Sequence, residues 1–177
     1  MKSDFNLGIK KTLSILNEMQ SEKIIGRYAI GGAIAAFIYV EPAFTADIDI
    51  FVIMDGASLD PLGPINDWLK GRGYDKYVRE GLLIEGWAVQ FIPASNPLEK
   101  DALARAIPVD LEGVQTWIFS QEHLMALCLE LGRPKDHARL ASFLLGKTYD
   151  EKLFMEIINR FDLAKKWTMF KSQMTDL

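Results

Sequence analysis

The sequence predicts a mixed α/β fold with two regions that pack as one compact unit: a sheet region with an N-terminal helix over residues 1–119, and a helical region over residues 120–177. Up to residue 119, apolar runs of strand length alternate with turns that contain glycine or proline. From Ser120 onward only helical periodicity appears, and no linker separates the regions. We therefore expect the C-terminal helices to pack on the sheet region and to wall a cleft.

Composition limits the kinds of partner. The chain has 177 residues, of which 49% are hydrophobic and 25% charged, as in an ordinary soluble domain. Its net charge is −4 and its pI about 5.2. These values argue against broad, sequence-independent binding to nucleic acid, which relies on neutralising phosphates. A local basic pocket for one phosphorylated ligand remains compatible with them.

Cysteine usage and hydropathy favour a cytoplasmic protein with no membrane partner. Cys128 is the single cysteine, so no intrachain disulfide can form and a reducing compartment is expected. The longest uncharged run, residues 28–40, is too short to span a bilayer as a helix. Residues 1–20 mix acidic and basic side chains and lack the apolar core of a signal peptide.

The first half of the chain begins with an amphipathic helix over residues 4–20, predicted from hydrophobic residues at helical spacing. A short strand over residues 27–30 then ends at Gly31 and Gly32, and an alanine-rich, buried helix covers residues 33–39. Next come a loop marked by Pro42, a strand over 47–54, a loop over 55–63 and a helix over 64–70 that opens at a proline.

Three strands are predicted next, over residues 74–79, 82–85 and 87–92, with turns at Glu80-Gly81 and at Gly86. Asn96, Pro97 and Glu99 then form a strong helix start, because the asparagine can cap the helix and the glutamate can close a capping box. That helix runs to about residue 106. Two short strands, residues 109–111 and 114–119, complete the sheet region.

The helical region is divided by its capping residues. Ser120 caps a helix that ends at Gly132, and Pro134 opens the next helix. Thr148 and Glu151 have the spacing of a capping box for a third helix. A last helix is predicted over residues 163–170.

Asp47 and Asp49 are the principal candidates for a metal site. Side chains two residues apart in a strand point to the same face, roughly 6.6–6.8 Å apart along it, so both carboxylates face one way while Ile48 and Ile50 pack beneath them. Neighbouring carboxylates repel each other and are hard to keep ionised without a cation between them. Oxygen ligands favour Mg²⁺ or Mn²⁺. The alternative, two solvated carboxylates on an exposed face, is less favoured because Asp is depleted in strands.

Gly31 and Gly32 are the candidates for phosphate binding. A glycine pair between a strand and a helix is often no more than a tight turn. Bare backbone N–H groups at a helix N-terminus can, however, bind phosphate. The functional interpretation is stronger here because a helix and then the Asp47/Asp49 strand follow.

The order of these features resembles the nucleotidyltransferase superfamily that includes DNA polymerase β, and it is most similar to the minimal bacterial AbiEii-type branch and its relatives. Two further segments share the resemblance, which covers about residues 22–146. Residues 87–94 stand where the family has the strand with its third carboxylate, and residues 132–136 resemble the Arg/Lys-Asp motif of the branch. The resemblance implies a nucleotidyltransferase-like mixed sheet flanked by helices.

The resemblance also implies Mg²⁺-dependent transfer of a nucleotidyl group from a nucleoside triphosphate to a hydroxyl acceptor, which could be a protein, an RNA or a small molecule. Asp47 and Asp49 would hold two Mg²⁺ ions, the arrangement for in-line displacement at phosphorus. Gly31 and Gly32 would cradle the phosphates, and Lys135 would reach them as a point charge.

Gln90 departs from the family pattern, because it stands where the third carboxylate is expected. Glutamine cannot act as a base and offers a metal only one neutral oxygen. Glu85 is a possible substitute if a bulge at Gly86 changes the strand phase. The alternative function is a catalytically degenerate nucleotide-binding or regulatory protein. The branch resemblance adds a component of a toxin–antitoxin system, with a protein partner.

A few remaining residues have two interpretations. Arg139 stands where relatives often carry an acid, so it either favours an acidic substrate or lies on a solvated face. Neither His123 nor His137 has a second ligand at metal spacing, so we expect surface or helix-end positions for both. Cys128 lies on an apolar helical stripe and is expected in the core.

Overall fold

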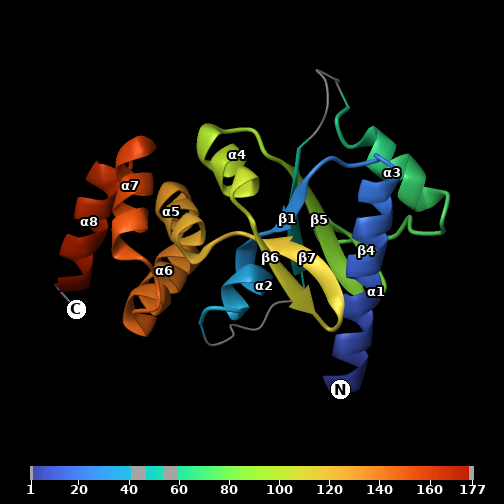
Figure 1. Ribbon diagram of the computed structural model, residues 1–177, viewed down its shortest axis with the longest axis horizontal. Helices are drawn as coiled ribbons and strands as arrows, with labels where there is room; N and C mark the ends of the chain where they lie inside the picture. The colour runs from blue at the N-terminus through green and yellow to red at the C-terminus, as the bar shows by residue number, and fades with distance from the viewer. Residues whose placement is uncertain (1, 41–46, 54–59, 176–177) are drawn as a thin grey trace.

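The computed structural model describes residues 2–40, 47–53 and 60–175 (Figure 1). The strands are β1 (Tyr28–Ile30), β2 (Asp47–Val52), β3 (Tyr77–Val78), β4 (Gly81–Ile84), β5 (Trp87–Pro93), β6 (Ile107–Leu111) and β7 (Val114–Ile118). The helices are α1 (Lys2–Ser21), α2 (Gly32–Phe37), α3 (Gly63–Lys70), α4 (Pro97–Ala104), α5 (Gln121–Leu131), α6 (Pro134–Gly146), α7 (Glu151–Arg160) and α8 (Ala164–Thr175).

The described strands form one mixed sheet in the order β3-β4-β5-β2-β1-β7-β6. At its centre, β2 runs antiparallel to β1 and parallel to β5. The register places Asp49 of β2 beside Gln90 of β5 and Ile50 opposite Ile30 of β1. The strand that carries the aspartates therefore has a hydrogen-bonded neighbour on each side.

The alternation of side chains along β2 decides which face holds the carboxylates. Ile48, Ile50 and Val52 are fully buried, and burying each contributes roughly 1.5–3 kcal/mol. Val52 lies opposite Tyr28, whose hydroxyl donates to Asn17 of α1, so this face packs against α1. A register slip of one residue would expose these side chains and bury the aspartates. Hydrophobic burial thus holds Asp47 and Asp49 on the other face.

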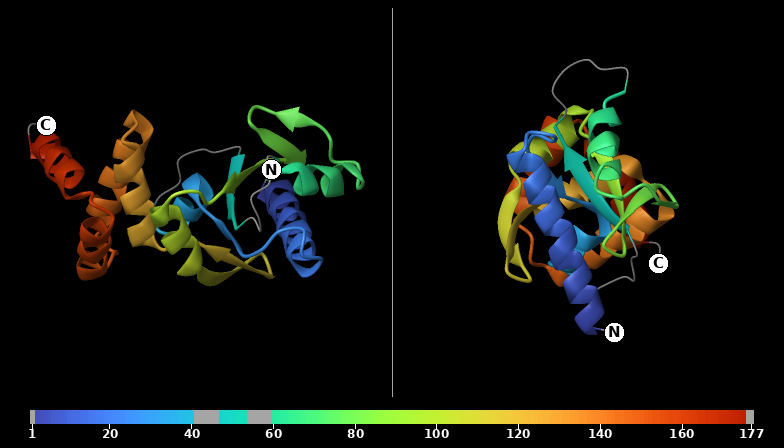
Figure 2. Two further views of the ribbon diagram at one scale, coloured as in Figure 1. Left: turned by 90° about the horizontal axis from the view of Figure 1, so that it is seen from above. Right: turned by 90° about the vertical axis from the view of Figure 1, so that its right-hand side faces the viewer.

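Helix α1 lies across the buried face of the sheet. Its Thr12 hydroxyl donates to the Ile84 carbonyl of β4 at 3.1 Å, and its Asn17 amide donates to the Gln115 carbonyl of β7 at 2.8 Å. These bonds fix α1 to strands on both sides of the centre. Figure 2 shows α1 and α3 at one end of the molecule and α7 and α8 at the other.

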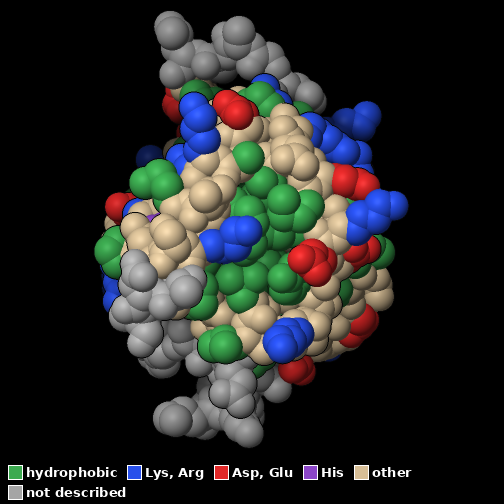
Figure 3. All heavy atoms as spheres, turned by 90° about the vertical axis from the view of Figure 1, so that its left-hand side faces the viewer, with side chains coloured by type: hydrophobic (Ala, Val, Ile, Leu, Met, Phe, Trp, Pro, Cys, Tyr) green, Lys and Arg blue, Asp and Glu red, His purple; other side chains and the backbone are tan. Residues whose placement is uncertain are grey.

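Helix α5 connects the sheet region to the C-terminal helices. It contacts α2 and α4 on one side and α6, α7 and α8 on the other, and most of its residues are buried. Figure 3 faces the C-terminal end, where hydrophobic side chains gather in the middle of the face, with Lys, Arg, Asp and Glu around them. Leu145 and Met169 are among the exposed apolar side chains of α6 and α8.

Most predicted elements are confirmed, with several corrections. The capping box predicted from Thr148 and Glu151 is wrong, because Asp150 caps α7 by accepting from the Leu153 N–H, while the Thr148 hydroxyl donates to Gln121 Oε1. Aspartate is the stronger N-cap, and its position directly before the helix decides the start. Strand β6 begins at Ile107, two residues early, and β3 keeps only two residues of the predicted six. Pro42 and residues 54–59 lie outside the described residues.

Within the described ranges, no helix has both the length and the apolar character needed to cross a membrane.

Candidate active site

A cavity of about 700 Å³ lies between the sheet and the helices α2, α5 and α6. It brings together five of the six residues that the sequence singled out for a site: Gly32, Asp47, Asp49, Gln90 and Lys135. Gly31 is not among the residues that line it. Arg133 and Arg139 of the opposite wall also face this space. One wall is therefore acidic and the other basic.

Gly32 and Asp49 are packed so closely that each determines the other. Gly32 has a positive φ of 56°, and a Cβ built at this position would overlap Asp49 Oδ2. The Gly31 N–H donates to the Asp49 carbonyl at 2.9 Å, which ties the turn to β2. The second glycine is thus required twice, for its backbone conformation and for the space that the carboxylate occupies.

The charge on Asp49 is disfavoured in the absence of a cation. Burial and the neighbouring Asp47 raise the pKa of Asp49, while Arg139, Lys135 and Arg133 act in the opposite direction. The basic residues do not fully offset the first two causes. A divalent cation bound between the carboxylates would favour the ionised form.

The aspartates fit Mg²⁺ in one specific way. In the described part of the chain, no group of three or more His, Cys, Asp or Glu residues is placed to hold a metal ion. Mg²⁺ is commonly bound by one or two carboxylates, with waters and substrate phosphates as its other ligands. Asp47 and Asp49, in a cavity with a basic wall for phosphates, match this mode of Mg²⁺ binding. They do not match a site in which protein side chains supply all the ligands.

The basic wall is built where α5 ends and α6 begins. Gly132 ends α5 in the left-handed conformation, and Pro134 opens α6. The Arg133 guanidinium donates to both oxygens of the buried Asp136, at 2.6 and 3.2 Å. This bidentate pair fixes the turn that carries Lys135 into the cavity. Arg139 lies one helical turn after Lys135 and also lines the cavity, so it does not lie on a purely solvated face.

Glu85 does not replace the missing carboxylate, and that prediction is wrong. It stands in the β4–β5 turn with a positive φ of 49°, accepts from the Tyr74 hydroxyl at 2.6 Å and pairs with Lys11 at 3.3 Å. The first of these contacts lowers the pKa of Glu85. The turn changes the direction of the chain but leaves Glu85 outside the cavity lining.

A different glutamate reaches Gln90. Glu80, in the turn between β3 and β4, lines the cavity and accepts a hydrogen bond from Gln90 Nε2 at 3.3 Å. From the sequence, Glu80-Gly81 was predicted only as a turn. The position of Glu80 could have been inferred from the antiparallel pairing of residues 82–85 with 87–92. This pairing brings the turn that precedes residue 82 to the level of Gln90.

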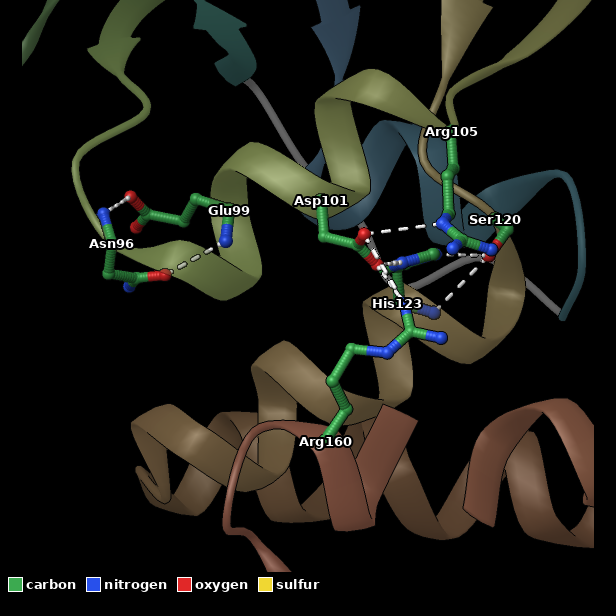
Figure 4. Close-up of polar contacts among 7 residues, drawn as sticks. All are labelled: Asn96, Glu99, Asp101, Arg105, Ser120, His123 and Arg160. Atoms are coloured by element: carbon green, nitrogen blue, oxygen red, sulfur yellow. Dashed lines mark hydrogen bonds and ion pairs between the residues drawn. The ribbon is translucent and has the colours of Figure 1, made fainter. Parts of the chain in front are cut away.

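His123 is the largest departure from the expected site (Figure 4). It is buried, not on the surface, although it does stand in the first turn of α5. Its Nε2 lies 3.0 Å from Asp101 Oδ2, and its Nδ1 lies 2.8 Å from Ser120 Oγ. Because a carboxylate only accepts, neutral His123 carries its proton on Nε2 and accepts at Nδ1.

The hydrogen bonds from Ser120 to His123 to Asp101 have the arrangement of an activated serine nucleophile. Their surroundings indicate a structural role instead. The Ser120 hydroxyl is the N-cap of α5 and is buried, and none of Ser120, His123 and Asp101 lines the cavity. Asp101 of α4 also pairs with Arg105 and with Arg160 of α7. The cluster therefore ties α4, α5 and α7 together, beside the predicted and confirmed capping box of Asn96 and Glu99.

This cluster predicts that the protein loses stability on mild acidification. Burial lowers the pKa of His123, against the opposing effect of Asp101. The unfolded histidine therefore binds a proton near its ordinary pKa of about 6.5 while the folded one stays neutral. Stability is lost as pH falls through this value toward the folded pKa, by up to about 1.4 kcal/mol per pH unit. Thermal unfolding between pH 8 and pH 5 measures the slope; an equal slope in His123→Gln would contradict the assignment.

Comparison with protein-family models and with curated protein sequences finds no match. Several solved structures are similar in fold, and two of them are as follows. The solution structure of the antibiotic-resistance factor ANT(2'')-Ia has a TM-score of 0.53 at 14% identity, with 100% of both chains covered. The crystal structure of an antigenic nucleotidyltransferase-like protein from Paracoccidioides brasiliensis has a TM-score of 0.55 at 13% identity, covering 89% of this chain and 90% of that one.

These similarities confirm the predicted nucleotidyltransferase-like mixed sheet flanked by helices. At 13–14% identity they concern the fold alone. The AbiEii-type branch, and the toxin–antitoxin partner that it implied, stay predictions.

Proposed function

We propose that this protein is a Mg²⁺-dependent nucleotidyltransferase that binds a nucleoside triphosphate and transfers its nucleotidyl group to a hydroxyl acceptor. The observation that carries the proposal is one cavity in which Asp47 and Asp49 face Lys135 and Arg139. A volume of about 700 Å³ is within the range of small-molecule sites. The similar folds support the same reaction class.

Each wall of the cavity has its own task in this proposal. Asp47 and Asp49 would hold Mg²⁺, which supplies charge stabilisation at the phosphorus and orients the leaving pyrophosphate. Lys135 and Arg139 bind phosphate oxygens and neutralise their charge. The Gly32 N–H, beside Asp49, would bind a phosphate oxygen, while Gly31 supports the turn by donating its N–H to the Asp49 carbonyl. Asp136 holds Arg133 and keeps the turn before α6 in place.

Transfer of label from nucleoside triphosphates tests the reaction. Each of the four triphosphates, labelled in the α-phosphate, is incubated with the protein, Mg²⁺ or Mn²⁺, and a cell extract as the source of acceptors. Wild-type protein should produce a labelled acceptor and pyrophosphate, and Asp47→Asn should produce neither. Equal labelling by the two proteins would contradict the proposal.

Gln90 supports a second candidate, a protein that binds the nucleotide without turning it over. Gln90 lies directly beside Asp49 in the sheet, at the level where a third carboxylate would serve, and an amide cannot take a proton. The same experiment separates the two candidates. Metal-dependent binding without pyrophosphate release, together with a gain of release in Gln90→Asp, would favour the binding protein.

The phosphate role of Lys135 has a measurable consequence. Lys135→Ala should weaken nucleoside triphosphate binding by at least about tenfold, since a hydrogen bond to a charged group contributes about 1.5–3 kcal/mol. Mn²⁺ binding without nucleotide should not weaken, because Lys135 repels a cation. Calorimetric titration measures both affinities. Lys70→Ala, an exposed lysine in the last turn of α3, is the matched control and should bind like wild type. An equal loss in both variants would mean that only net charge matters.

A further inference from the structure

The cavity holds a carboxylate that the family pattern does not account for. Glu80 stands in the two-residue turn between β3 and β4, where Arg79 takes a positive φ of 55°. We propose that Glu80 is the general base of the proposed reaction, accepting the proton of the attacking hydroxyl in place of the carboxylate that Gln90 replaces. This inference rests on the proposed function and adds the residue that activates its acceptor.

The sheet register brings Glu80 to this place. Leu82 of β4 lies opposite Val89 of β5, which puts Gly81 at the level of Gln90. Gln90 in turn lies beside Asp49 of β2. A Cβ on Gly81 would lie 2.8 Å from the Ala88 carbonyl carbon, so glycine lets β4 lie close against β5. The glutamate that precedes this glycine consequently reaches over the end of the Gln90 side chain.

The hydrogen bond between Gln90 and Glu80 gives each a distinct task. A carboxylate only accepts, so the Gln90 amide must present Nε2 to Glu80, as it does at 3.3 Å. Gln90 thus holds the carboxylate in the cavity without supplying or removing a proton. It is a positioning residue, and Glu80 is the group that would touch the substrate hydroxyl.

The other described carboxylates near the cavity have other roles. Asp47 and Asp49 are the metal ligands of the proposed function. Glu99 Oε2 accepts from the backbone N–H groups of Ser95 and Asn96, at 2.8 and 3.2 Å, and so caps α4. Asp136 is buried against Arg133. Glu80 is exposed at the rim of the cavity, where an acceptor would enter.

The proton and the electron pairs balance as follows. The acceptor hydroxyl gives its proton to a Glu80 carboxylate oxygen while its own oxygen forms a bond to the α-phosphorus. The bond from the α-phosphorus to the oxygen that bridges to the β-phosphorus breaks, and its electron pair leaves with pyrophosphate. Protonated Glu80 then returns its proton to water.

The test compares pyrophosphate release and metal binding in matched variants of the full chain. Glycerol and water serve as the hydroxyl acceptors, with each nucleoside triphosphate and Mn²⁺. Glu80→Gln should lower kcat roughly 10²–10⁴-fold, the usual contribution of a general base, with little change in KM for the triphosphate. The acidic limb of the pH–rate profile should disappear. Calorimetric Mn²⁺ affinity should stay at the wild-type value, because Glu80 is not a metal ligand in this assignment.

Two further variants separate proton transfer from charge and from folding. Glu99→Gln removes the same charge from the same cavity, and glutamine can keep the capping box, so it should retain wild-type kcat. Adding Gln90→Asp to Glu80→Gln should restore at least about tenfold in kcat, since it returns a base to the neighbouring position.

The outcomes distinguish this inference from the proposed function. Wild-type kcat in Glu80→Gln, or an equal loss in Glu99→Gln, would overturn the role of Glu80 alone. If wild-type protein binds Mn²⁺ and nucleotide but releases no pyrophosphate with any acceptor, the role of Glu80 and the transfer reaction are both overturned, while nucleotide binding stands. Absence of any metal-dependent nucleotide binding would overturn the proposed function and this inference together.

Discussion

The Asp49→Asn variant is expected to weaken Mg²⁺-dependent nucleotide binding by at least about 100-fold, because changes merely adjacent to a metal commonly cost 10–100-fold in affinity and Asp49 would be a direct ligand. Asparagine keeps the size of the side chain beside Gly32 but removes its charge. Calorimetric titration with each nucleoside triphosphate and Mg²⁺ measures the loss. Asp67→Asn, an exposed position on α3, makes the same chemical change far from the cavity and should bind like wild type.

The same substitution should make the metal-free protein more stable at neutral pH. Burial and Asp47 raise the pKa of Asp49, so the folded state holds its proton more tightly than the unfolded state does. Stability that is present below the ordinary Asp pKa of about 3.9 is therefore lost as pH rises through the folded pKa. Asparagine does not ionise, so the Asp49→Asn variant does not lose this stability. Its Tm at pH 7 should exceed that of wild type. Mg²⁺ should then raise the Tm of wild type only. A lower Tm in the metal-free variant would contradict the electrostatic account.

Gly32→Ala is expected to damage both the fold and the site. The backbone conformation at φ 56° costs an L-residue about 1–2 kcal/mol, and the added Cβ would also displace the Asp49 carboxylate. We expect a combined loss of about 2–4 kcal/mol in unfolding free energy. Binding of Mg²⁺ with nucleotide should fall at the same time, because the displaced carboxylate is its ligand.

Gly113→Ala is the matched control for Gly32→Ala. Gly113 also has a positive φ, of 80°, but a Cβ there would meet nothing within 4 Å. It should therefore lose only the backbone part of the stability and should keep full nucleotide binding. Urea denaturation and calorimetry measure the two effects separately. Equal losses of binding in both variants would show that the contact between Gly32 and Asp49 is unimportant.

Local patterns were sufficient to predict most elements of this fold, although not all of their ends. The alternation around Ile48 and Ile50 assigned Asp47 and Asp49 to a common face, and the register of β2 confirms it. The Asn96 capping box followed from three residues and is present. The capping box predicted from Thr148 and Glu151 is absent because Asp150, directly before the helix, is the stronger N-cap.

Contacts between distant segments were beyond local patterns. His123 reads as an ordinary residue in the first turn of a helix, and only the packing of α4 against α5 brings Asp101 to its ring. Glu80 and Glu85 stand at the two ends of one strand and look equivalent in the sequence. The hairpin geometry decides between them, since one end faces the cavity and the other faces Tyr74 and Lys11.

The central claim is that the acidic and basic walls of one cavity act together on a metal-bound nucleotide. Calorimetric titration of the wild-type protein with a non-hydrolysable nucleoside triphosphate, in Mg²⁺ and again in EDTA, tests it most directly. We predict saturable binding at one nucleotide per chain in Mg²⁺ and binding at least about tenfold weaker in EDTA, where Asp47 and Asp49 repel the phosphates. Equal affinity under the two conditions, or no binding under either, would contradict it.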